Sequence, residues 1–60
     1  MKFREIEKII TEDGWIFKSA RGSHYQYTHP IKQGKVTIPR HNRDLDPKTL
    51  KTILKQAGIE

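Results

Sequence analysis

The chain has 60 residues, no cysteine and a formal net charge of +5, from 12 Lys and Arg against 7 Asp and Glu. This length predicts one small domain, 1–60, and excludes a deep enclosed pocket, so we expect a large ligand on an open surface. Without cysteine there is no disulfide framework and no thiolate zinc site. We expect no signal peptide and no membrane span, which indicates a cytoplasmic protein, and the basic charge favours a polyanion or an acidic protein as partner.

The first predicted element is a helix over residues 3–13. Its apolar residues recur at helical spacing, at Phe3, Ile6, Ile9 and Ile10. Gly14 follows as a residue suited to the left-handed conformation that ends many helices. Residues 15–19 then form a strand rich in strand-favouring residues, with Trp15 and Phe17 on one face.

A turn at Arg21-Gly22 leads into a second strand, residues 23–28. Side chains alternate along a strand, so Tyr25 and Tyr27 share the face that we expect in the core. His24 therefore falls on the opposite, more solvated face. The same alternation argues against the tyrosines as a platform for stacking bases.

His29-Pro30 ends this strand, since proline cannot donate to a ladder. A loop leads to a third strand over residues 35–38, in which Val36 and Ile38 face the core. A basic loop, 39–45, reaches Asp46-Pro47, the N-cap and first position of a last helix that ends at Gly58. The order α-β-β-β-α predicts an α+β fold in which a three-stranded antiparallel sheet carries both helices on one face.

An exposed strand histidine in a basic protein is a candidate general acid or base, because unperturbed histidine exchanges a proton near pH 7. RNA cleavage by attack of the 2′-hydroxyl on the adjacent phosphorus needs such a group, with donors to the phosphate oxygens. We assign one of its proton transfers, as general acid or base, to His24. The candidate RNA-binding residues are Lys18, Arg21, Ser23, Gln26, Lys35, Arg40, His41 and Arg43. His41 is either a second proton carrier or a passive phosphate ligand, and His29 is interpreted as a turn residue. No ligand spacing among the three histidines indicates a metal, and we expect no cofactor.

Four segments, in this order, resemble the HicA toxin family of bacterial and archaeal toxin–antitoxin systems. They are Gly14-Trp15, Gly22 to Tyr27, Ile38 to His41 and Thr49 to Ile59. The resemblance implies a fold like the double-stranded-RNA-binding domain and a metal-independent endoribonuclease that cleaves messenger RNA and inhibits translation. It also implies that His24 is the catalytic histidine and that a HicB-type antitoxin covers it.

Two other interpretations stay open. A non-catalytic basic module would hold A-form RNA through its phosphates and leave it intact during incubation with a chelator. A pure interaction domain would dock an acidic protein and show no RNA affinity at low salt.

Overall fold

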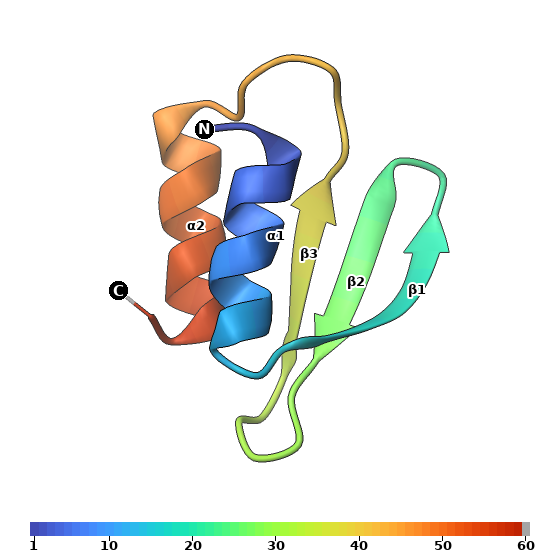
Figure 1. Ribbon diagram of the computed structural model, residues 1–60, viewed down its shortest axis with the longest axis vertical. Helices are drawn as coiled ribbons and strands as arrows, with labels where there is room; N and C mark the ends of the chain where they lie inside the picture. Colours follow the sequence, from blue (N-terminus) through green and yellow to red (C-terminus); the bar gives the residue numbers. More distant parts are fainter. Residues whose placement is uncertain (60) are drawn as a thin grey trace.

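A computed structural model describes residues 1–59 of the chain. The elements are α1 (Phe3–Glu12), β1 (Ile16–Arg21), β2 (His24–Thr28), β3 (Lys35–Pro39) and α2 (Pro47–Ala57). The strands form one antiparallel sheet in the order β1-β2-β3. Both helices lie beside β3, and β1 is the strand farthest from them (Figure 1). The predicted α-β-β-β-α fold is confirmed, and Glu60, the last residue of the predicted domain 1–60, lies outside the described residues.

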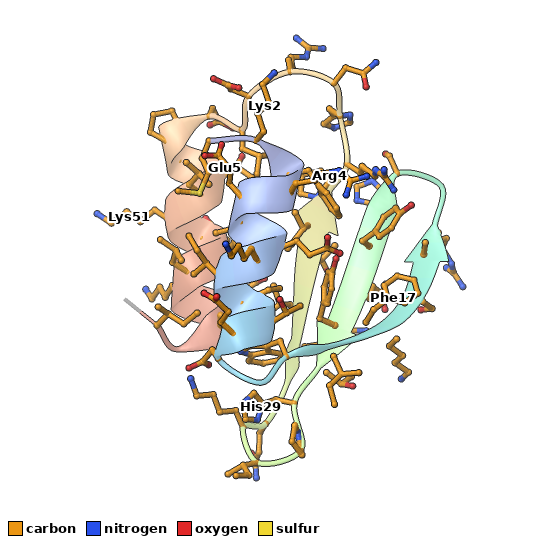
Figure 2. The ribbon with its side chains drawn as sticks, viewed as in Figure 1. Lys2, Arg4, Glu5, Phe17, His29 and Lys51 are labelled. Atoms are coloured by element: carbon orange, nitrogen blue, oxygen red, sulfur yellow. The ribbon has the colours of Figure 1, made fainter. Side chains whose placement is uncertain are left out.

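The core forms where the apolar stripes of the two helices meet one face of β2 and β3. Its fully buried side chains include Ile6 and Ile10 from α1, Ile53 from α2 and Tyr27 from β2. The predicted core positions Val36 and Ile38 are confirmed, and the loop residue Leu45 joins them. Figure 2 shows side chains filling the space between the helices and the sheet.

Capping residues at both ends of α2 determine where this helix begins and ends. Asp46 is its N-cap, and its carboxylate accepts a hydrogen bond from the Thr49 N–H at 3.4 Å. Pro47 occupies the first turn, and Gly58 ends the helix with φ +69°. Both boundaries agree with the sequence prediction. Within residues 1–59, no helix has the length and apolar character needed to cross a membrane.

The first strand differs from its prediction. It spans Ile16–Arg21 instead of 15–19, and the turn that follows is Gly22-Ser23 rather than Arg21-Gly22. Trp15 precedes the strand and is buried, and its indole Nε1 donates to the Ala57 carbonyl at 3.2 Å. Phe17 stays 49% exposed although its ring lies near those of Tyr25 and Tyr27. The reason is tertiary: β1 is an edge strand that extends beyond the helices (Figure 2).

Candidate active site

His24 is the first residue of β2, and its side chain is exposed as predicted. It follows a two-residue turn in which Gly22 has φ +61° and Ser23 has negative φ, the pattern of a type II′ hairpin. The turn pairs His24 with Arg21 of β1, so their side chains stand on the same face of the sheet. Among residues 1–59, the imidazole of His24 has no hydrogen-bond partner. The hairpin thus presents a free imidazole at one end of the sheet, beside a guanidinium.

The strand register decides which of the other candidate residues share this face with His24. Gln26 is one pair further along β2, opposite Ser19 of β1. Lys35 pairs with Thr28 at the far end of the strand, about 13 Å from His24 along the backbone. Lys18 stands at a bulge between Phe17 and Ser19 and has no residue paired opposite it. The structure therefore brings Arg21 close to His24 but leaves Lys35 remote.

Arg40 belongs to the same end of the sheet but turns to the opposite face. Its backbone N–H donates to the Ser23 carbonyl at 2.6 Å, which ties the end of β3 to the hairpin turn. Its guanidinium nevertheless donates from Nη1 to the Tyr25 hydroxyl at 2.9 Å, on the face away from His24. The predicted RNA-binding residues thus divide between two faces that meet at one end of the sheet.

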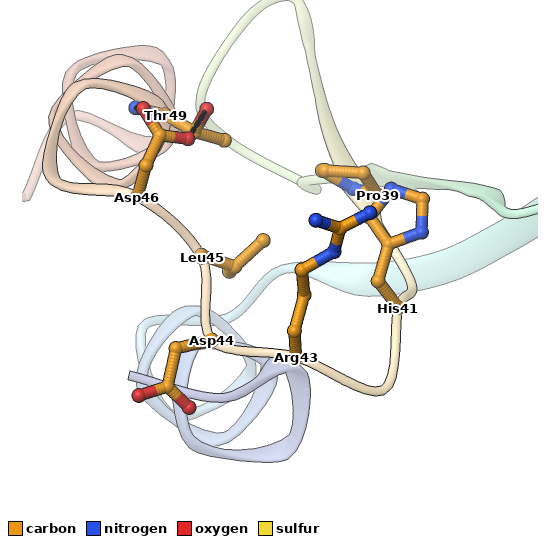
Figure 3. A pocket seen from close by; sticks show the side chains of 7 residues that line it. All are labelled: Pro39, His41, Arg43, Asp44, Leu45, Asp46 and Thr49. Atoms are coloured by element: carbon orange, nitrogen blue, oxygen red, sulfur yellow. Dashed lines mark hydrogen bonds between the residues drawn. The ribbon is translucent and has the colours of Figure 1, made fainter.

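The loop after β3 carries the remaining candidates, His41 and Arg43, both exposed. They line a hollow whose floor includes Leu45, and Figure 3 shows their side chains on the same side of the loop, toward Pro39. The hollow is completed by Pro39, Asp44, Asp46 and Thr49. A hydrogen bond from the Thr49 hydroxyl holds the pKa of Asp46 below its usual range, which keeps this N-cap carboxylate charged. The hollow therefore carries both signs of charge.

The model of one protein family, the HicA toxin of bacterial toxin–antitoxin systems, matches residues 3–59. The chain belongs to the HicA toxin family. No curated protein matches it. The matched residues include both helices, the whole sheet and the loop that carries His41. Every element of the site described above therefore lies within the HicA match.

His29 of this HicA toxin has a structural role that the sequence did not indicate. Its Nδ1 accepts the N–H groups of Ile31 and Lys32, each at 3.0 Å, and its Nε2 donates to the Asp13 carbonyl at 2.8 Å. The ring also meets Trp15 edge-on, with centroids 5.1 Å apart. His29 joins the end of α1 to the β2–β3 loop. In Figure 2 it lies at the opposite end of the molecule from Arg4. Both ring nitrogens are occupied, so His29 does more than fill a turn.

No group of three or more His, Cys, Asp or Glu side chains within residues 1–59 is placed to hold a metal ion.

The sequence did not indicate a second cleft, which lies beside the N-terminus of α1. Its lining residues are Lys2, Phe3, Arg4, Arg40, His41 and Asn42. Lys2 and Arg4 carried no sequence signal, because their proximity to Arg40 depends on how α1 packs beside β3.

Proposed function

We propose that this HicA toxin is an endoribonuclease that cleaves messenger RNA, with His24 as a general acid or base. One observation carries the proposal: His24 is exposed and unpartnered within residues 1–59, whereas both ring nitrogens of His29 are bonded to the backbone. An imidazole that makes no internal hydrogen bond can exchange a proton with a bound substrate. A messenger RNA substrate also implies action in the cytoplasm.

The reaction needs two proton transfers and one in-line displacement. A base removes the 2′-hydroxyl proton, O2′ bonds to the adjacent phosphorus, the bond from phosphorus to O5′ breaks, and an acid protonates O5′. The products are a 2′,3′-cyclic phosphate and a 5′-hydroxyl. His24 performs one of the two proton transfers, and His41 is the candidate for the other. Arg21, across the hairpin from His24, is placed to stabilise charge that develops on the phosphate oxygens. No step in this scheme requires a metal ion.

The proposed protein partner is a HicB-type antitoxin that covers His24. The family to which the chain belongs is defined by toxin–antitoxin systems. The face that carries His24 also carries Arg21 and Lys35, so an acidic surface complements it. An antitoxin on this face would compete with RNA, and it would raise the melting temperature of the toxin by mass action.

The test compares wild type, His24→Ala and Lys51→Ala on a messenger RNA fragment in excess chelator. Lys51 is the control because it is exposed on α2, away from the sheet (Figure 2). We expect His24→Ala to lower the cleavage rate by about 10²–10⁴, and Lys51→Ala to cleave at the wild-type rate. Trp15 fluorescence during urea unfolding shows whether each variant is folded. A folded His24→Ala variant that cleaves at the wild-type rate would refute the role of His24, and RNA bound but uncut by wild type would indicate a non-catalytic module.

A further inference from the structure

Arg40 is held in place more firmly than the other cationic candidates. Its guanidinium carbon lies 5.3 Å from the centroid of the Phe3 ring and 5.3 Å from that of Tyr25. These two rings meet edge to face, with centroids 5.2 Å apart. The hydrogen bond from Nη1 to the Tyr25 hydroxyl fixes the direction of the guanidinium. Arg40 is nevertheless exposed, so its remaining N–H donors are open to a ligand.

Three elements converge to make this arrangement. Phe3 is the first residue of α1, Tyr25 lies in β2, and Arg40 directly follows β3. The bond from the Arg40 N–H to the Ser23 carbonyl fixes its backbone as well. A long side chain ordinarily loses rotamer entropy when it binds, and here that loss has already occurred during folding.

The other cationic side chains that the sequence indicated as RNA-binding residues lack such support. Within residues 1–59, the side chains of Lys18, Arg21, Lys35 and Arg43 have no hydrogen-bond or ion-pair partner. Each can attract an anion, but none is directed toward one position. Arg40 therefore differs from these cations because the Tyr25 hydroxyl and the two aromatic rings fix the orientation of its guanidinium.

We propose that Arg40 binds a backbone phosphate of the RNA next to the linkage that His24 cleaves, and that Phe3 and Tyr25 are positioning residues that hold it there. The inference rests on the proposed function and identifies how the same site binds its substrate. A planar guanidinium with several N–H donors matches two phosphate oxygens. The cleft beside it is also lined by Arg4 and by Lys2, whose ammonium contacts the Asn42 carbonyl and Asp44. Figure 2 shows Lys2 and Arg4 at the end of the molecule where β3 ends.

The position of Arg40 relative to His24 supports the assignment to neighbouring phosphates. His24 pairs with Pro39, and Arg40 is the next residue in the chain. The two side chains therefore stand on opposite faces of the same end of the sheet. An RNA strand that crosses this end meets His24 at one phosphate and Arg40 at another.

The experiment measures binding of a short single-stranded RNA at several salt concentrations, with His24→Ala as the parent so that no RNA is cut. Arg40→Gln removes the charge, so we expect affinity to fall about tenfold. The slope of log affinity against log salt should also decrease in size by about 0.7. Tyr25→Phe keeps the charge and removes the acceptor of the directed hydrogen bond, and Arg40→Lys keeps the charge but loses the planar guanidinium. For both variants the slope should stay at the parent value while affinity falls about fivefold. Lys51→Gln is the control for charge loss elsewhere on the surface.

Other results would oppose the role of Arg40, the proposed endoribonuclease activity, or both. A folded Tyr25→Phe variant that binds RNA as tightly as the parent would show that the hydroxyl serves stability only. If the Arg40 variants lose affinity for the antitoxin but not for RNA, Arg40 belongs to the protein interface. RNA binding without cleavage by wild type would refute the endoribonuclease and leave the assignment of Arg40 standing. No RNA binding by the parent would refute both.

Discussion

Replacing Gly14 by alanine tests how the end of α1 supports the whole fold. Gly14 has φ +108°, a conformation that residues with a Cβ rarely adopt. A Cβ built at this position would lie 2.7 Å from Nε2 of His29. The alanine methyl therefore strains the backbone and displaces the imidazole that joins α1 to the β2–β3 loop.

The magnitude follows from these two effects. The strained backbone conformation costs about 1–3 kcal/mol. Displacing His29 weakens its bonds to the Asp13 carbonyl and to the Ile31 and Lys32 N–H groups, each worth about 1 kcal/mol. With all three bonds lost, the sum is about 4–6 kcal/mol, which is at least as large as the whole stability expected of a 60-residue domain, about 3–5 kcal/mol. We expect Gly14→Ala to be largely unfolded.

Gly34→Ala is the matched control. Gly34 also has positive φ, +84°, but a Cβ there meets nothing within 4 Å. This variant carries the backbone strain without the collision. Urea unfolding followed by the fluorescence of Trp15, the only tryptophan, measures both variants. With a slope of about 1 kcal/mol per molar urea, Gly34→Ala should keep a cooperative transition with a midpoint of about 2 M, whereas Gly14→Ala should lack a folded baseline even without urea. Equal midpoints would refute the structural role assigned to the contact with His29.

Two further predictions concern the pH dependence of stability. The ammonium of Lys32, 2.5 Å from an Asp13 oxygen, holds the pKa of Asp13 below its usual 3.8. The stability that this carboxylate contributes is therefore present above about pH 4 and is lost as pH falls through the lowered pKa. Asp13→Asn should reduce the loss of stability at acid pH, measured as urea midpoints against pH, and an unchanged loss would contradict the pairing. Burial, together with the hydrogen bond to Glu7, raises the pKa of Tyr27 above its usual 10.0, so folding keeps a proton that the unfolded chain releases and stability falls as pH rises above about 10. Tyr27→Phe should lose less stability than wild type between pH 9 and about 11 in the same measurement, and equal losses would contradict the assignment.

Local patterns were sufficient to predict much of this fold. The helical spacing of Phe3, Ile6 and Ile10 identified the buried side of α1, and Asp46-Pro47 identified the start of α2. The alternation along β2 separated the buried Tyr27 from the exposed His24. These predictions succeeded because each depends on residues within one element and on its period.

The features that sequence reasoning missed depend on distant parts of the chain. The exposure of Phe17 follows from the edge position of β1, and the register shift at Lys18 from how β1 pairs with β2. The structural role of His29 requires α1 and the β2–β3 loop to meet. Likewise, the support of Arg40 by Tyr25 appears only when the end of β3 packs beside β2. Periodicity within one segment carries no information on such contacts.

The chemical nature of the RNA ends produced in excess chelator tests the account most directly. If His24 moves a proton for attack by the 2′-hydroxyl, mass spectrometry of the wild-type products will find 2′,3′-cyclic phosphates and 5′-hydroxyls, and folded His24→Ala will yield almost none. Fragments that end in a 3′-hydroxyl and a 5′-phosphate, or equal yields from both proteins, would contradict it.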